Sequence, residues 1–340
     1  MDEITRISVD TSKSVFTLHG TDAQGRAALR RNLRRQDMVR FFANQAPLEV
    51  VMEACGGSHH WARTLAALGH RVRLIPAQYV KPFVKRSKND RNDAQAISEA
   101  ANRPDMCDVA VKSAQAQARA MLLSVRELLV RQRTQMINAL RGHAAEMGLV
   151  GAQGDRGFAT LRASIEVDEE MPAAARQALR LLGNEVDRLD ARLLEADKRL
   201  LAEHKADATS QRLVAIPGVG PMTALSFTLR VDARQFESGR HFAAWLGLVP
   251  RERSTGGKQR MGGISRAGNE RLRQLLVLGA TAVIRFAKSA GSGRSAWLLA
   301  LLERKPRKLA AVALANKMAR VIWAMLTSGD DYRRPAPVVV

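Results

Sequence analysis

The chain has 340 residues, of which 46% are hydrophobic and 4% are aromatic. This length allows two or three domains with buried cores. Its 54 Lys and Arg residues outnumber the 33 Asp and Glu residues, so the formal net charge is +21. A chain this basic favours a polyanionic partner, with nucleic acid first and an anionic membrane surface as the competitor. The low aromatic content argues against recognition through many exposed stacking rings.

The hydropathy of the chain argues against a membrane protein. The first residues, MDEITRISVD, lack the basic and then apolar order of a signal sequence. No apolar run of about eighteen residues is evident. We therefore expect a cytoplasmic protein. Cys55 and Cys107 lie far apart and lack zinc-site spacing, so we expect them to be reduced, buried thiols.

Strands and helices alternate over residues 1–110. Short apolar runs predict strands at 4–10 (ITRISVD), 15–20 (VFTLHG), 48–54 (LEVVMEA) and 70–76 (HRVRLIP). Helices are expected at 57–69 and from residue 90 to about residue 102. This alternation indicates an α/β domain.

The next region, residues 111–208, is predicted to be helical. Residues 113–147 favour a helix and contain no proline, and the glycine-rich segment 148–158 (GLVGAQGDRGF) is expected to be a flexible loop. Residues 176–204 carry six basic and six acidic residues around a heptad seam. The seam consists of Leu179, Leu182, Val186, Leu189, Leu193, Ala196 and Leu200. We interpret it as a coiled coil for oligomerisation; the alternative is a bundle helix that packs within its own chain.

The third region, residues 209–330, carries most of the excess charge and is followed by a tail, 331–340. Between Arg251 and Arg334 there are 18 Lys and Arg against 5 Asp and Glu, a net of +13, which predicts the polyanion-binding face. The segment IPGVGPMTA resembles the hairpin of a helix-hairpin-helix element. The backbone N–H groups of Gly218 and Gly220 would then bind a phosphate at a helix N-terminus, or the glycines only permit a tight turn.

Four acidic residues of the first region stand where a metal site would need them. Asp10 and Glu53 each end an apolar strand, and Asp90 and Asp93 project from one face of a helix. Such a cluster would repel itself without a divalent cation, and Mg²⁺ prefers hard oxygen ligands. Helix capping or surface salt bridges are the alternative explanation. Four nearby cations would hold a phosphate backbone: Lys85, Arg86, Lys88 and Arg91.

A second candidate site lies in GLVPRERSTGGKQRMGGISRAGNERLRQLL, residues 247–276. Ser254 and Thr255 are hydroxyl residues in its glycine-rich part. A serine hydroxyl becomes a good nucleophile when a base, cation or metal activates it, and cations stabilise the charge that develops on a phosphate. The alternative is a flexible loop whose hydroxyls only contact solvent or phosphate. The cations in this stretch that we expect to bind nucleic acid are Arg251, Arg253, Lys258, Arg260 and Arg266.

The segments ISVDTSK, VVMEACGG and KNDRNDAQA together resemble the DEDD signature of insertion-sequence transposases related to the Piv and MooV DNA invertases. This is the insertion-sequence family numbered one-ten, and STGGK is similar to its eleven-eleven branch; the resemblance covers nearly the whole chain. It implies a RuvC-like, RNase H-fold N-terminal domain, a coiled-coil middle and a mostly helical C-terminal transposase domain. Its DEDD residues would be Asp10, Glu53, Asp90 and Asp93, which would bind Mg²⁺, with Mn²⁺ as an alternative.

The resemblance also implies a recombinase that excises and inserts its own mobile element. The loop serine would attack DNA and form a covalent phosphoserine; its distance before ISRAG favours Ser254, with Thr255 as the minor candidate. A structured noncoding (bridge) RNA would pair with donor and target DNA. The protein would be a homo-oligomer, a dimer or a tetramer on DNA, whose active site joins the serine domain of one subunit to the DEDD domain of another.

Two other functions fit the residues. One is a metal-dependent Holliday-junction-type endonuclease that works without a covalent intermediate. The other is a non-catalytic nucleic-acid-binding protein in which the acids are structural.

Overall fold

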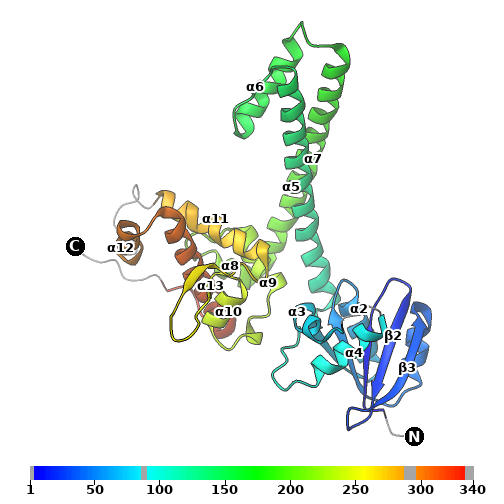
Figure 1. Ribbon diagram of the computed structural model, residues 1–340. Coiled ribbons are helices and arrows are strands. Elements are labelled where there is room, and N and C mark those ends of the chain that lie inside the picture. Colours follow the sequence, from blue (N-terminus) through cyan, green and yellow to red (C-terminus); the bar gives the residue numbers. More distant parts are fainter. Residues whose placement is uncertain (1–3, 86–89, 287–295, 334–340) are drawn as a thin grey trace. The chain divides into compact units, whose positions relative to one another are not determined.

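The computed structural model describes residues 4–85, 90–286 and 296–333 (Figure 1). The chain divides into two compact units, Met1–Gln117 and Ala118–Val340. The first unit is mixed α/β and the second is mostly helical. Cys55 and Cys107 are free thiols, but both are exposed, so the expectation that they are buried is wrong.

A five-stranded sheet forms the centre of the first unit. Its strands are β1 (Arg6–Asp10), β2 (Val15–Thr21), β3 (Ala27–Arg34), β4 (Glu49–Ala54) and β5 (Arg71–Pro76), in the order β3-β2-β1-β4-β5. β1, β2 and β3 are antiparallel neighbours, whereas β4 is parallel to both β1 and β5. The four predicted strands are confirmed, and β3 is an additional edge strand.

Helices cover both faces of this sheet. After a 3₁₀ turn (Arg35–Asp37) come α1 (Met38–Ala43) and α2 (Ser58–Ala67); α3 (Ala77–Val80), a second 3₁₀ turn (Lys81–Phe83) and α4 (Asp90–Ala101) follow β5. Successive residues of a strand face opposite sides. Val50 of β4 therefore packs in one core with Leu65 of α2, and Val51 packs in another core with Ile97 of α4. This packing brings the first turn of α4 to the end of β1.

The second unit begins with a helical hairpin made of α5 (Ala114–Glu146), α6 (Gly154–Val167) and α7 (Ala173–Ala206). Three arginines of α5, spaced seven residues apart, pair with acids of α7: Arg119 with Glu203, Arg126 with Asp197 and Arg133 with Asp190. This spacing matches two turns of helix, so the pairs form a ladder along the antiparallel helices.

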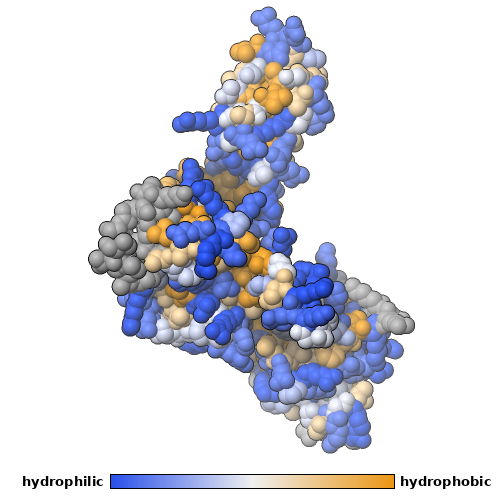
Figure 2. Space-filling model, turned by 60° about the vertical axis from the view of Figure 1, so that its left-hand side comes forward, coloured by the Kyte–Doolittle hydropathy of each residue, from blue (hydrophilic) through white to orange (hydrophobic). Residues whose placement is uncertain are grey.

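The heptad seam of α7 is buried inside the chain. Six of its seven residues are at least 91% buried, and Leu182 packs against the same core as Leu179 and Phe158. This is the arrangement that the bundle-helix alternative predicts. The glycine-rich segment is a loop only to residue 153, because Gly154 begins α6 and Gly157 packs against the Ala152 carbonyl. Apolar side chains show as orange patches on the end of the hairpin that carries α6 (Figure 2).

The remaining helices form one core. They are α8 (Ala208–Leu213), α9 (Pro221–Arg230), α10 (Gly239–Trp245), α11 (Glu270–Phe286), α12 (Ala296–Arg304) and α13 (Arg307–Ser328), with a 3₁₀ turn at Ala233–Gln235. A two-stranded hairpin, β6 (Pro250–Glu252) and β7 (Met261–Ile264), lies between α10 and α11. Among the described helices, α13 alone is long and apolar enough to cross a membrane. Its residues Ala315, Met318 and Ile322 pack in the core with Phe227 and Phe242.

Candidate functional site

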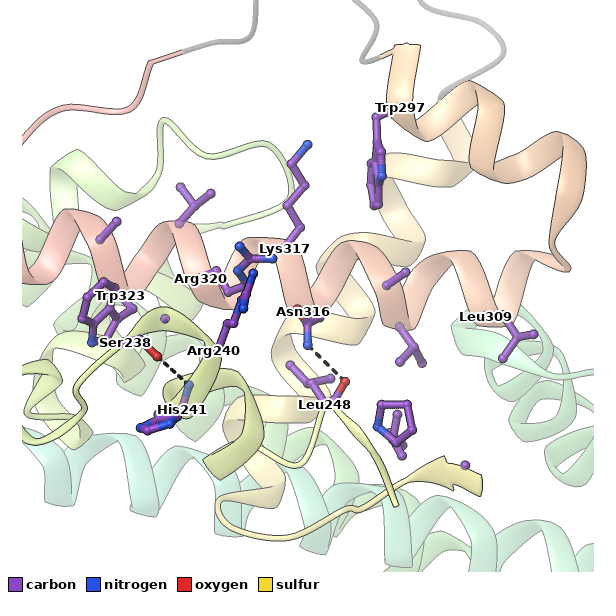
Figure 3. A pocket seen from close by; sticks show the side chains of 18 of the residues that line it. Ser238, Arg240, His241, Leu248, Trp297, Leu309, Asn316, Lys317, Arg320 and Trp323 are labelled. Carbon is purple, nitrogen blue, oxygen red and sulfur yellow. Dashed lines mark hydrogen bonds between the residues drawn. The ribbon is translucent and has the colours of Figure 1, made fainter. Parts of the chain in front are cut away.

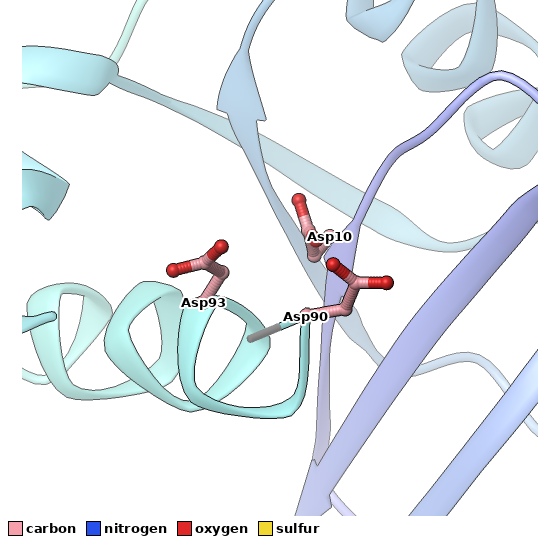
Figure 4. Close-up of side chains that lie close together, drawn as sticks. All are labelled: Asp10, Asp90 and Asp93. Atoms are coloured by element: carbon pink, nitrogen blue, oxygen red, sulfur yellow. The ribbon is translucent and has the colours of Figure 1, made fainter. Parts of the chain in front are cut away.

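Three aspartates meet at the C-terminal end of β1, the central strand of the N-terminal sheet (Figure 4). Asp10 ends β1, while Asp90 and Asp93 lie in the first turn of α4. One carboxylate oxygen from each residue lies within 4.8 Å of the other two. Residues three apart lie on the same side of a helix, and the buried Ala94 and Ile97 turn that helix onto the sheet. The structure therefore brings three of the four predicted acids together.

The electrostatics of Asp10 show that this cluster is unfavourable when it is fully ionised. The pKa of Asp10 is raised from 3.8 to about 6, first by burial and then by the charges of Asp93, Asp90 and Glu53. A hydrogen bond from the Thr11 backbone acts in the opposite direction. A divalent cation would replace this repulsion with attraction. Oxygen-only donors of this kind fit Mg²⁺.

Glu53 lies beside this cluster on the neighbouring strand. β4 runs parallel to β1, with Met52 opposite Val9, so Glu53 comes next to Asp10 in the register. Its charge contributes to the raised pKa of Asp10. Its carboxylate is not among the oxygens that lie within 4.8 Å of one another. Glu53 is thus an electrostatic neighbour of the three aspartates in this structure.

The predicted cations near these acids are only partly described. Lys85 and Arg91 are exposed, and Arg91 lies in α4 between the two aspartates. Arg86 and Lys88 lie outside the described residues.

Ser254 lies just before the tight turn of the β6–β7 hairpin. Thr255 pairs with Lys258 across the turn, and the Lys258 N–H donates to the Thr255 carbonyl. Between them Gly256 and Gly257 have φ angles of +53° and +76°. Two successive positive φ angles are typical of a type I′ turn, which glycine adopts without strain. The STGGK segment is therefore the tip of a regular hairpin.

The hydroxyl of Ser254 has two partners within the hairpin. It donates to the Glu252 carboxylate at 2.8 Å and accepts from the backbone N–H of Arg260 at 3.2 Å. Our sequence analysis missed Glu252, although residues two apart in a strand share a face. A carboxylate in this position can accept the hydroxyl proton when serine acts as a nucleophile.

Four of the predicted nucleic-acid-binding arginines line one cleft of about 630 Å³ beside this hairpin. The lining residues are Arg251, Arg253, Arg260, Arg266 and the strand segment 261–264, with no acid among them. The Arg251 guanidinium is held by two hydrogen bonds to the Ser265 carbonyl. Lys258 is exposed at the hairpin tip. A cleft with four guanidinium groups and no acid in its lining suits a phosphate group.

The two glycines of IPGVGPMTA have different surroundings. Gly218 has a φ angle of +85°, and a Cβ atom there would lie 2.7 Å from the Gly279 carbonyl oxygen in α11. This close approach accounts for glycine at position 218. Gly220 precedes α9 as its N-cap, is exposed, and has open space where a Cβ would lie. This helix end is therefore accessible to a ligand at Gly220, although Pro221 at the first position of α9 offers no N–H.

Comparison with known proteins gives two family matches. Residues 7–148, which include all four acids, match a transposase family labelled DEDD and IS110, and residues 210–293, which include Ser254, match the transposase IS116/IS110/IS902 family. The chain is 48% identical over 336 residues to a putative transposase of Sinorhizobium fredii, covering 98% of this chain and 87% of that protein. It is 46% identical to a probable family 20 transposase of Pseudomonas aeruginosa, covering 97% and 99%. It is 43% identical to the transposase for insertion sequence element IS1111A of Coxiella burnetii, covering 98% and 92%.

Proposed function

Because the chain belongs to the IS110 family of insertion-sequence transposases, we propose that it cuts and rejoins DNA with a carboxylate metal site and a covalent serine. The metal ligands would be Asp10, Glu53, Asp90 and Asp93, and the nucleophile would be Ser254. The observation that carries this proposal is the cluster of three aspartates whose oxygens lie within 4.8 Å of one another.

We assign the RuvC-like RNase H fold to the N-terminal domain. The mixed sheet with helices on both faces supports this assignment, as does an acid at the end of β1 beside an acidic helix start. The middle domain, residues 111–208, and the C-terminal transposase domain, residues 209–330, would then position the serine and the DNA.

Asp10, Asp90 and Asp93 would hold the divalent cation, and Glu53 would join them from β4. Mg²⁺ fits these oxygen donors, and Mn²⁺ takes the same ligands. When bound, the cation supplies neutralising charge to the oxygens that attack and leave phosphorus. The carboxylates themselves would hold the cation at the C-terminal end of β1, where the exposed Lys85 and Arg91 would contact the neighbouring phosphates.

The serine step follows from the contacts of the hairpin. The Ser254 oxygen attacks phosphorus while Glu252 takes the hydroxyl proton, so a serine–phosphate bond forms and the DNA P–O bond breaks. The departing DNA oxygen takes up a proton from solvent. A hydroxyl on the strand to be joined then attacks the phosphoserine and releases its proton to solvent, while the serine–phosphate bond breaks and serine regains its proton from Glu252. The arginines of the adjoining cleft would stabilise the charge on the phosphate during both steps.

Nucleic-acid partners are supported by the charge of the C-terminal region, a net of +13 between residues 251 and 334. The substrates would be donor and target DNA, and a structured guide RNA would supply sequence recognition by base pairing. A protein that contacts mainly the phosphate backbones of DNA and the A-form surfaces of RNA needs many cations. It does not need a module that reads the edges of bases.

A homo-oligomer is supported by the outer face of α5. Because the heptad seam of α7 is buried in its own chain, another surface has to make the contact. Met121, Val125 and Leu128 are 61%, 45% and 45% exposed. Their spacing of four and three residues places them on one side of the helix, as in a coiled-coil seam.

The proposal can be tested by trapping the covalent intermediate. Protein co-expressed with the noncoding DNA that flanks its gene would be mixed with labelled element-end DNA and Mg²⁺, then separated on a denaturing gel. We expect a protein–DNA adduct in wild type that is lost in Ser254→Ala, in Asp93→Asn and after RNA digestion. Thr255→Ala is the matched control and should keep the adduct. Cleavage without an adduct, unchanged in Ser254→Ala, would identify a hydrolytic nuclease instead.

A further inference from the structure

A second, larger hollow in the C-terminal region lies next to the serine hairpin. It has a volume of about 1330 Å³ and is lined by α10, α12, α13 and the β6–β7 hairpin (Figure 3). Its apolar lining includes Leu248, Val312, Ala313 and Val321. The Asn316 side chain donates to the Leu248 carbonyl at 3.2 Å, which fixes the loop after α10 to α13. The groove is therefore a structured surface.

Three cations project around this groove. Arg240 comes from α10, and Lys317 and Arg320 come from α13 (Figure 3). No acid is among the lining residues, and none of the three cations pairs with an acid within the described part of the chain. His241, which also lines the groove, has its Nδ1 atom 3.3 Å from a carboxylate oxygen of Glu237. Three unneutralised cations around one groove indicate an anionic ligand.

Trp297 adds a partly exposed aromatic ring. Its residue surface is 40% exposed, and the Lys317 ammonium lies 4.5 Å from the centre of its ring. An indole next to cations is the combination that single-stranded nucleic-acid sites use, because a base stacks on the ring while its phosphate meets the charge. Duplex DNA hides its base faces, so this arrangement favours an unpaired strand.

We propose that this groove binds a single-stranded nucleic-acid segment. One unstacked base lies on Trp297 and the apolar lining, and the adjoining phosphates contact Arg240, Lys317 and Arg320. The inference rests on the proposed function in so far as DNA is the substrate. Because Pro250 and the segment 262–264 of the serine hairpin form part of the same groove, a strand bound here leads towards Ser254.

The experiment measures binding without catalysis. Full-length Ser254→Ala protein would be titrated into a dye-labelled single-stranded 12-mer from the element end, and into the matching duplex, with fluorescence anisotropy as the readout. Stacking of one base is worth about 1–3 kcal/mol, so Trp297→Leu should weaken single-strand binding by roughly 5-fold to 150-fold. Trp297→Phe keeps a ring and should retain most of the affinity. Lys317→Gln should weaken binding several-fold.

Lys308→Gln is the matched control, since Lys308 is an exposed cation of the same helix that does not line the groove. It should leave the affinity nearly unchanged. Equal affinities for wild type, Trp297→Leu and Lys317→Gln would overturn the proposal. The proposal would also be overturned if Trp297→Leu lowered the oligomer mass in light scattering without changing strand binding. The groove would then hold a second copy of this chain. Failure to find the covalent adduct would contradict the proposed function but not this proposal, since strand binding in the groove needs neither Ser254 nor the acids.

Discussion

Replacing Asp10 by asparagine should stabilise the metal-free protein while removing its response to Mg²⁺. The Asp10 carboxyl has a pKa of about 6, raised from 3.8 by burial and then by the charges of Asp93, Asp90 and Glu53. An acid whose pKa rises on folding prefers to be protonated in the folded state. Its ionised form therefore lowers the free energy of unfolding at neutral pH.

The size of the effect follows from the pKa. A rise from 3.8 to about 6 corresponds to about 3 kcal/mol for a group without solvent screening. Asp10 is half-exposed, so water screens the charges and the expected penalty falls to on the order of 1 kcal/mol. The penalty is fully present above pH 6 and disappears as the pH falls towards 3.8. Asp10→Asn should recover it, raising the Tm of the N-terminal unit by about 4 °C at pH 7.5.

Thermal unfolding in EDTA and in Mg²⁺, each at pH 7.5 and pH 5, tests this reasoning. In EDTA the gain from Asp10→Asn should be large at pH 7.5 and small at pH 5. Mg²⁺ should raise the Tm of wild type, more at pH 7.5 than at pH 5, because protons compete for the carboxylate. Asp105→Asn, at an exposed aspartate outside the cluster, should change neither result. The explanation fails if Asp10→Asn lowers the Tm in EDTA, or if Mg²⁺ stabilises it as much as wild type.

Four further substitutions test the packing of the second unit, each by urea unfolding. Gly218→Ala places a Cβ against the Gly279 carbonyl at a positive φ and should lower the free energy of unfolding by at least about 2 kcal/mol. Gly220→Ala meets open space and should lower it by less than about 1 kcal/mol. Because alanine keeps the backbone N–H, Gly220→Ala should also still bind DNA if that N–H holds a phosphate. Arg273→Met should cost about 3 kcal/mol, because the buried guanidinium donates to two loop carbonyls, one of them in the segment after β7. Glu127→Gln should lower the free energy of unfolding by about 1–3 kcal/mol, since two arginines, one in α9 and one in α11, share its carboxylate. An unchanged urea midpoint in Arg273→Met or in Glu127→Gln would show that the contact removed contributes nothing to stability.

Residues whose surroundings are local could be predicted from the sequence. Buried strands such as β1 and β4 are apolar and end in an acid, and an acid pair three apart has to share a helix face, so the positions of Asp10, Asp90 and Asp93 followed. β3 was missed because six of its eight residues are exposed and only Leu33 is buried, which removes the alternation that marks a strand. Glu252 was missed because its contact with Ser254 requires an extended backbone at residues 252–254, where we expected a glycine-rich loop.

The groove could not be predicted for a different reason. Arg240, Trp297 and Lys317 come from three helices that are far apart in the sequence, and each residue alone has an ordinary role. Trp297 suggests a core or an interface, and a lone lysine suggests a solvated surface. Only the packing of α10, α12 and α13 places them around one hollow.

Like charges gathered around one point mark the candidate sites of both units. Along the helical hairpin three arginines of α5 are paired with acids of α7, and these pairs neutralise cations at a place where the helices only pack together. The cleft of four arginines has no acid in its lining, and burial together with the charges of Asp93, Asp90 and Glu53 raises the pKa of Asp10 to about 6. Ligands that bind only the folded state stabilise it by mass action. A divalent cation should therefore stabilise the first unit, which holds the aspartates, and a phosphodiester should stabilise the second unit, which holds the arginine cleft.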